Sequence, residues 1–369
     1  MNIGAAFTLI RNGASIKQTD SAGGIPITRI ETIANRVIDR NHMGYADIYN
    51  GDKYSSYFLR DGDILMSHIN SIQHLGKAAI YHPLDEKEKI IHGMNLLVLR
   101  ANQKILDNQF AYFYFSSDSF LHKLPRITKK SVNQASFTVS ELKKIDIPCP
   151  ALSQQHKIAK ILSIIQTLCN KRNEQLKIFD ELVKSRFLEM FGDIELNSQK
   201  MQKMMWQEVF DTQTGKLDAN AAVKGGRYPF FTCAKEISTI DEYAYDCEAL
   251  LLAGNNAVGD YDVKYYKGKF NAYQRTYILI LKNRQYSYSV FKFQLEQKLR
   301  YLQLQSKGTN TRYLTMGILR SLDFIVPPIV KQQEFAQFVN ATDKSKMAVQ
   351  KSLDELEILK KSLMQTYFG

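Results

Sequence analysis

The chain has no long hydrophobic run, which argues against an integral membrane protein. Nowhere in its 369 residues does an apolar stretch approach the ~20 residues that a membrane-crossing helix needs. The N-terminal sequence MNIGAAFTLIRNG carries a short apolar patch, but no basic region precedes it and no clear cleavage site follows. We therefore expect a cytoplasmic protein that does not associate with a membrane.

Cysteine is also scarce, and its spacing suits neither metal binding nor disulfide bonding. The four cysteines form no CxxC pair and have no His at ligand spacing: Cys149, Cys169, Cys233 and Cys247. This pattern favours buried free thiols over a zinc site or a disulfide framework. We predict no metal-binding residues.

Motifs for catalysis are missing as well. The chain contains no GxxxxGK[ST] loop that could bind nucleotide phosphates. The Val326-Pro327-Pro328-Ile329 segment lacks the Asn or Asp before the prolines, and the aromatic residue after them, of an adenine methyltransferase motif. The stretch from Asp260 to Lys264 faintly resembles the acidic-Lys cluster of a nuclease, but a solvated turn is the preferred interpretation. We predict no catalytic residues.

Positive charge is the first feature present in excess. The formal net charge is +12, with 49 Lys and Arg against 37 Asp and Glu. Such a surplus favours a polyanionic partner and steers association with it. Since many basic proteins bind no nucleic acid, the charge alone does not decide the function.

A long internal repeat organises the chain. The segment IDIPCPALSQQHKIAKIL, from Ile145, matches LDFIVPPIVKQQEFAQFV, from Leu322, at an offset of 177 residues. The same offset extends to the last two residues, where Phe368-Gly369 matches Phe191-Gly192. Since chance does not hold one register over so many positions, we interpret the match as a duplication.

Each copy of the repeat predicts a strand that ends at proline, followed by a long helix. The helical stretch is free of Pro and Gly and carries apolar residues at a spacing of three or four. A helix of about 35 residues, or roughly 50 Å, with one apolar stripe needs another long helix to bury that stripe. We expect the two duplicates to pair as an antiparallel coiled coil with pseudo-twofold symmetry. The alternative is that each stripe packs on its neighbouring globular domain.

The regions before the helices, about 1–145 and 205–322, are alike in style and different in sequence. Both contain short runs of β-forming residues broken by Gly, Asn and Asp turns, and both end in a more helical patch. Gly13 and Gly215 are 202 residues apart, whereas the chain segments that end the two copies are 177 apart. The first region is therefore about 25 residues longer, which loop insertions explain.

The expected fold is α+β, with two β-rich domains that are each followed by a long helix. We place the first β-rich domain at 1–150 and its helix at 151–192. A polar linker at 193–205 leads to the second β-rich domain at 206–328, and the second helix occupies 329–369.

This organisation resembles the specificity (S) subunit of a type I restriction-modification system. The resemblance covers nearly the whole chain and rests on two variable domains, each followed by a similar P-x(2–3)-QQ helix that ends in Phe-Gly. The matching segments are Pro150 to Gln155, Pro327 to Gln333 and the opening of the second domain from Trp206 to Lys216. Two features depart from the family pattern. The first copy has no Trp that corresponds to Trp206, which we attribute to where the chain starts, and His156 stands where the family often has Glu or Gln.

The resemblance implies a division of labour. Each β-rich domain would be a target-recognition domain that reads one half of a bipartite sequence in double-stranded DNA. The helices would act as a spacer and bind two methyltransferase (M) subunits, and restriction (R) subunits can join. S-adenosylmethionine, ATP and Mg would belong to those partners, so this chain is expected to be a non-catalytic subunit without a cofactor.

Candidate DNA-binding residues lie in donor-rich loops, since phosphate contacts need Lys, Arg and small polar groups, and base reading needs Arg, Asn, Gln or Ser. The best candidates recur at the 177 offset: Lys130 with Lys307 and Asn133 with Asn310. Their neighbours Lys129, Gln134 and Arg312 join them. Weaker candidates in Gly- or Asn-containing turns are Lys17, Gln18, Arg29, Asn255, Asn256 and Arg275. The alternative is a shared structural turn in which Asn tolerates a left-handed backbone.

Two other functions stay open at this point. One is an enzyme, such as a fused nuclease or methyltransferase that acts alone; a purified chain that cuts or modifies DNA would support it. The other is a duplicated DNA-binding adaptor or regulator not associated with a methyltransferase. A neighbouring gene for an adenine methyltransferase would argue against the second.

Overall fold

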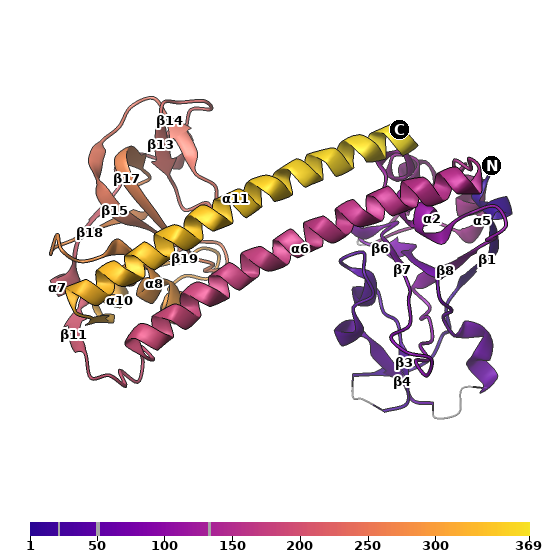
Figure 1. Cartoon of the computed structure of the whole chain (residues 1–369), viewed down its shortest axis with the longest axis horizontal. Coiled ribbons are helices and arrows are strands. Elements are labelled where there is room, and N and C mark those ends of the chain that lie inside the picture. The colour runs from indigo at the N-terminus through magenta and orange to yellow at the C-terminus, as the bar shows by residue number, and fades with distance from the viewer. Residues whose placement is uncertain (21–22, 49–51, 132–133) are drawn as a thin grey trace. The chain divides into compact units, whose positions relative to one another are not determined.

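The computed structural model describes residues 1–20, 23–48, 52–131 and 134–369. These residues form two compact units. Unit 1 comprises Met1–Asn173 with Lys351–Gly369, and unit 2 comprises Glu174–Gln350. Two long helices, α6 (Leu152–Phe191) and α11 (Ile329–Phe368), each contribute to both units (Figure 1). Among the described residues, no helix combines the length and apolar character needed to cross a bilayer.

The rest of unit 1 consists of short elements. Its helices are α1 (Ile3–Ala6), α2 (Asn108–Phe115), α3 (Asp118–Leu121), α4 (Leu124–Ile127) and α5 (Val139–Lys144), with 3-10 turns η1 (Glu31–Ile33), η2 (Arg40–His42), η3 (Asp52–Tyr57) and η4 (Ile72–His74). Its strands are β1 (Phe7–Asn12), β2 (Gln18–Thr19), β3 (Ile25–Ile27), β4 (Gly44–Ala46), β5 (Ile64–Ser67), β6 (Ile69–Asn70), β7 (Ala78–Ile80), β8 (Leu96–Ala101), β9 (Lys129–Lys130) and β10 (Ala135–Ser136).

Unit 2 repeats this order with longer strands. Its helices are α7 (Trp206–Val209), α8 (Tyr288–Gln297), α9 (Leu299–Gln305) and α10 (Met316–Arg320), with one 3-10 turn, η5 (Ala219–Ala221). Its strands are β11 (Gln202–Met205), β12 (Phe210–Thr214), β13 (Tyr228–Phe231), β14 (Ser238–Ile240), β15 (Tyr245–Ala253), β16 (Asn255–Asn256), β17 (Val263–Ala272), β18 (Thr276–Leu281), β19 (Arg312–Tyr313) and β20 (Asp323–Val326). The predicted α+β fold with two β-rich domains is confirmed.

The long helices run antiparallel in each unit, as predicted. In unit 1 the Lys360 ammonium, near the end of α11, donates to the Gln166 side chain on α6. In unit 2 the Lys346 ammonium lies 2.5 Å from the Asp180 carboxylate. The alternative also holds in part, because the apolar stripe of α6 packs on the neighbouring domain as well. Ile158 and Leu162 belong to the core of unit 1.

The phase of the predicted stripe on α6 is wrong at two positions. Leu168 and Leu182 are 40 % and 45 % exposed, while Cys169 is buried and Val183 packs against the core of unit 2. The buried positions advance by four and three residues in turn, which is the seam of a coiled coil. A shift of one residue rotates a helix by about 100°, so Cys169 takes the place expected for Leu168.

The two β-rich domains share one sheet topology. The sheet of unit 1 has the order β1-β8-β5-β7, and the sheet of unit 2 has the order β12-β18-β15-β17-β13-β14. The pairing register agrees, with Ile64 opposite Leu99 in one domain and Leu250 opposite Leu279 in the other. Corresponding strands therefore match although their sequences differ.

The extra length of the first domain lies in its loops, as predicted. The offset between corresponding residues is 203 at Ile27 and Phe230, but 186 at Ile64 and Leu250. Most of the about 25 additional residues thus fall between β3 and β5, where the chain forms η1, η2 and η3. These turns enlarge the domain without interrupting its sheet.

The attribution of the missing Trp to the start of the chain is wrong. Ile3 occupies the position of Trp206, because each begins the short helix before the first strand of its sheet. The Ile3 amide donates to the Ile145 carbonyl (2.8 Å), and the Trp206 amide donates to the Leu322 carbonyl (2.9 Å). Ile145 and Leu322 are 177 residues apart, so the two sites match and only the side chain differs.

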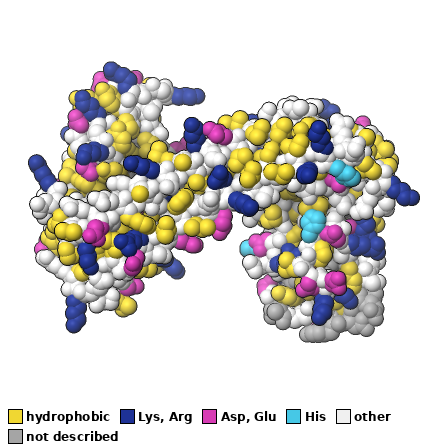
Figure 2. Space-filling model, in the orientation of Figure 1, with side chains coloured by type: hydrophobic (Ala, Val, Ile, Leu, Met, Phe, Trp, Pro, Cys, Tyr) yellow, Lys and Arg dark blue, Asp and Glu magenta, His cyan; other side chains and the backbone are white. Residues whose placement is uncertain are grey.

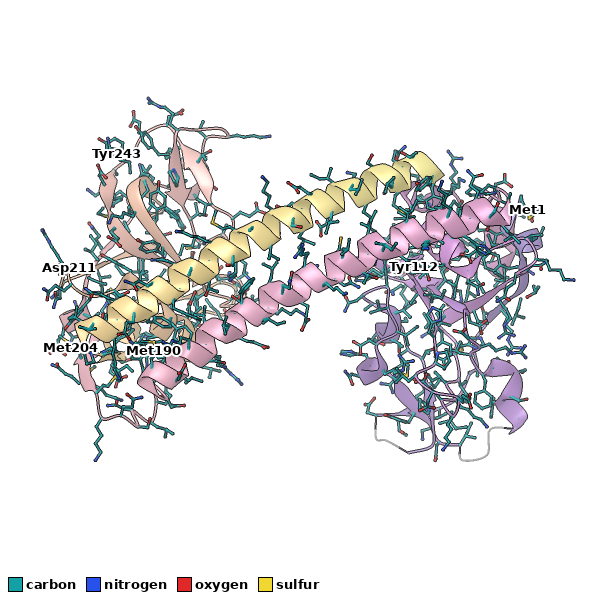
Figure 3. All side chains as sticks on the ribbon, viewed as in Figure 1. Met1, Tyr112, Met190, Met204, Asp211 and Tyr243 are labelled. Carbon is teal, nitrogen blue, oxygen red and sulfur yellow. The ribbon has the colours of Figure 1, made fainter. Side chains whose placement is uncertain are left out.

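The segment 193–205, expected to be a polar linker, includes a strand. Gln202–Met205 form β11, which pairs antiparallel with β20. Met190, at the end of α6, belongs to the core of unit 2, and Met204 on β11 packs against that core (Figure 3). This pairing fixes where the second domain begins relative to the helix that precedes it.

Candidate nucleic-acid interface

An exposed hairpin in unit 2 carries the best sequence candidates. The Lys307 amide donates to the Tyr313 carbonyl (3.1 Å), and the Tyr313 amide donates to the Lys307 carbonyl (2.8 Å). At Gly308, φ is +97°, and a Cβ there would lie 2.2 Å from the Thr311 carbonyl oxygen, so the turn requires glycine. Lys307 and Asn310 are exposed at this hairpin.

The structure does not support the alternative reading of Asn310 as a left-handed turn residue. Among the described residues, positive φ outside glycine occurs only at Arg36, Asn197 and Lys200. The left-handed position of this hairpin is Gly308. Asn310 therefore has no conformational role of that kind, whereas Asn133 lies outside the described residues.

The weaker candidates of unit 2 converge on the same hairpin. Strand β16 pairs with β19, so that Asn255 lies opposite Tyr313 and Asn256 opposite Arg312. The neighbouring Gly254 amide donates to the carbonyl of the exposed Arg275 (2.9 Å). Six candidates from four segments thus form one group: Asn255, Asn256, Arg275, Lys307, Asn310 and Arg312.

Two members of this group support the loops themselves. The Arg312 guanidinium donates to the Gln303 carbonyl (3.0 Å) and so joins β19 to the end of α9. The Asn256 side-chain oxygen accepts from the amides of Val258 (2.9 Å) and Asp260 (3.3 Å). These contacts hold the segment between β16 and β17 in one conformation.

Unit 1 presents the corresponding arrangement. Strand β10 pairs with both β9 and β6, and this places the exposed Lys129, Lys130 and Gln134 beside Asn70. The Phe137 amide donates to the His68 carbonyl (3.1 Å), just as the Leu314 amide donates to the Gly254 carbonyl (2.8 Å). The recurring lysines therefore occupy equivalent hairpins.

The remaining candidates of unit 1 lie on the small β2-β4-β3 sheet. Arg29 donates to the Gln18 side chain (2.8 Å), the Asp20 carboxylate (2.5 Å) and the Thr19 carbonyl (3.2 Å). Its guanidinium therefore ties β2 to the segment after β3, which makes it a weaker candidate for DNA. Lys17, just before β2, is exposed.

Sequence analysis missed Asn95. Asn95 occupies the position of Arg275, because β8 and β18 follow both residues directly and match at an offset of 180. It is exposed and borders a hollow of about 390 Å³ whose lining also includes Gln18 and Arg29. No motif marks Asn95, since the offset of 180 applies only after the insertions of the first domain are placed.

The acidic stretch from Asp260 to Lys264 is held by ion pairs. The Lys235 ammonium lies 2.6 Å from the Asp260 carboxylate, and the Lys264 ammonium lies 2.5 Å from the Asp262 carboxylate. The hydrogen bond to Asp260 raises the pKa of Lys235. Among the described residues, no group of His, Cys, Asp and Glu side chains could hold a metal ion. Figure 2 shows Lys and Arg scattered over both units among Asp and Glu.

Comparison with known proteins identifies the family. The family described as type I restriction modification DNA specificity domain matches residues 2–178 and 198–357. The chain belongs to this type I restriction-modification specificity family. The family resemblance stated from the sequence is confirmed, and association with DNA and with other subunits of a restriction system is a family property.

Relatives of the specificity family extend over most of the chain. It is 30 % identical to the MjaX type I restriction enzyme specificity subunit of Methanocaldococcus jannaschii, over 96 % of this chain and 89 % of the relative. It is 39 % identical over 132 residues to the EcoDI specificity subunit of Escherichia coli, which covers 35 % of this chain and 28 % of the relative.

A solved structure shares the fold. The S subunit of the type I restriction-modification system from M. genitalium superposes with a TM-score of 0.67 at 16 % identity, and the match covers 100 % of this chain and 95 % of that one. The likeness supports two β-rich domains on paired helices as the architecture of the chain.

Proposed function

We propose that this chain is the non-catalytic specificity subunit that directs a type I restriction-modification complex to a bipartite sequence in double-stranded DNA. The observation that carries the proposal is the pair of equivalent lysine hairpins, 129–136 and 307–313, set in domains of one topology and different loop sequence. Each domain would read one half-site. The paired helices would set the gap between the halves.

The long helices supply surfaces for protein partners. Large apolar side chains are exposed on them in each unit: Ile164, Leu168, Ile358 and Leu359 in unit 1, and Ile178, Leu182, Leu188, Val330 and Met347 in unit 2. Exposed apolar groups on a helix pair fit partners that bury them. We assign this role to two M subunits, one for each repeat, with R subunits as further members of the complex. S-adenosylmethionine, ATP and Mg are assigned to those partners.

A methylation map tests the proposed function. DNA from cells that carry this chain with its methyltransferase would be read by long-read sequencing and compared with DNA from cells without the chain. We expect methyladenine in both halves of a split motif, lost when the chain is absent. An unchanged map would contradict the proposal and favour a DNA-binding adaptor, and cleavage or methylation by the purified chain alone would contradict a non-catalytic role.

Removing the two hairpin lysines should weaken DNA binding most at low salt. The double substitution Lys130→Ala and Lys307→Ala takes away two phosphate-reaching charges, which should lower the slope of log affinity against log salt by about 2. The measurement is fluorescence anisotropy of labelled duplex between low and moderate salt. Lys87→Ala with Lys224→Ala, which removes two exposed lysines away from the hairpins, is the control. An unchanged slope would remove Lys130 and Lys307 from the interface.

A further inference from the structure

One position in each recognition domain carries an exposed, β-branched apolar side chain. These residues are Ile72, 58 % exposed, and Val258, 67 % exposed. They are 186 residues apart, the separation that also relates β6 to β16. Both follow by two residues the strand that pairs with the lysine hairpin. The two side chains therefore occupy equivalent places beside the candidate interface.

The backbone at both positions is well held. The Val258 amide donates to the Asn256 side chain (2.9 Å), and the Val258 carbonyl accepts from the Gln303 amide group (3.2 Å). Ile72 begins the 3-10 turn η4, and its carbonyl accepts from the Leu75 amide (3.4 Å). The side chains are thus presented from fixed loops, so little conformational freedom is lost when they bind.

Folding does not explain why these side chains are apolar. Single exposed apolar residues are common on protein surfaces, so one of them would mean little. Here the same kind of side chain recurs at equivalent positions, although the next two residues differ: Gln73-His74 in one domain and Gly259-Asp260 in the other. Neither side chain belongs to a core of its unit. The shared feature is its place next to a polar, lysine-bearing hairpin.

We infer that Ile72 and Val258 each contact the C5-methyl group of a thymine in the half-site that their domain reads. The inference rests on the proposed DNA-reading function. The major groove admits a two-stranded β-ribbon such as β16–β19, and the thymine methyl is the apolar group that DNA displays there. A short branched side chain offers methyl groups at the right height beside Lys307 and Arg312. The contact would favour thymine over cytosine at one position in each half.

Deoxyuridine provides a direct test, because it differs from thymidine only by the methyl group. The full chain in complex with its M subunits would be titrated with its mapped target, and with targets in which the thymines of one half are replaced by deoxyuridine. Each half contains a thymine opposite its methylated adenine. Loss of one buried methyl should lower affinity about fourfold. Val258→Ala should abolish the thymine–uracil difference in one half, and Ile72→Ala should abolish it in the other.

Leu84→Ala serves as the matched control, since Leu84 is 73 % exposed in a loop between β7 and β8 that carries none of the candidates. It should keep the full thymine–uracil difference. Equal affinity for thymine and uracil targets, or equal losses on both with Val258→Ala and Ile72→Ala, would overturn the inference while the DNA-reading function stands. Failure of the unaltered complex to bind any split target would instead overturn the proposed function.

Discussion

Replacing Gln332 with alanine is expected to lower the free energy of unfolding of unit 2 by about 2–4 kcal/mol. The side chain is fully buried in the first turn of α11. Its oxygen accepts from the Ser287 amide (2.9 Å), and its nitrogen donates to the Pro327 carbonyl (2.8 Å). Alanine would leave both main-chain groups without these bonds and would open a cavity between them.

The single tryptophan makes this measurement specific to unit 2. Trp206 is 1 % exposed in the core of that unit, so its fluorescence during urea titration reports the unfolding of unit 2. Gln333→Ala is the control, because the neighbouring glutamine is exposed and should leave the midpoint unchanged. A Gln332→Ala variant as stable as the original chain would show that these buried hydrogen bonds contribute nothing net.

Phe187→Ala should cost about 3–5 kcal/mol, since it removes a fully buried aromatic ring. Phe187, near the end of α6, stacks on Phe293 with ring centroids 4.2 Å apart and meets Phe191 and Phe335 edge-on at 4.8 and 5.3 Å. The ring therefore joins α6, α8 and α11 within unit 2. Urea unfolding followed by Trp206 fluorescence measures the loss.

The duplication supplies the control for Phe187. Met364 on α11 stands at the corresponding position, 177 residues later, and is only half-buried in unit 1. Met364→Ala should cost about 1–2 kcal/mol, followed by far-ultraviolet circular dichroism. Comparable losses for the two variants would mean that the ring contacts of Phe187 add little to its burial.

The long helices were predictable because their signal is local and repeated. Forty residues without Pro or Gly, with apolar side chains every three or four, allow few other structures. The position of the seam was harder to predict, since Leu168 and Cys169 both suit an apolar stripe. Packing against α11 selects Cys169, and the sequence of α6 alone does not contain that information.

The candidate interface was predictable only in part. Lys130 and Lys307 recur at the offset of the helices, so the repeat alone marks them. Arg29 has the right chemistry but spends its guanidinium on Gln18, Asp20 and Thr19, a contact set that depends on how β2 and β3 fold together. Asn95 was missed because its match with Arg275 follows a different offset, which only the paired strands reveal.

The joint between each long helix and its β-rich domain is made to main-chain atoms. Gln155, fully buried, donates to the carbonyls of Ile105 (2.8 Å) and Pro150 (2.7 Å) and accepts from the Asp107 amide (2.9 Å). Gln332 makes the matching contact to the Ser287 amide. Every residue except proline offers the same amide and every residue the same carbonyl.

Such a joint tolerates almost any sequence in the domain that it holds, provided that the backbone keeps its path. Mutations can therefore accumulate in a recognition domain without loosening its attachment. For the same reason, a foreign domain of the same topology could be grafted onto either helix as a cassette. The glutamines make the scaffold indifferent to its cargo, and new specificities can arise by exchange as well as by gradual change.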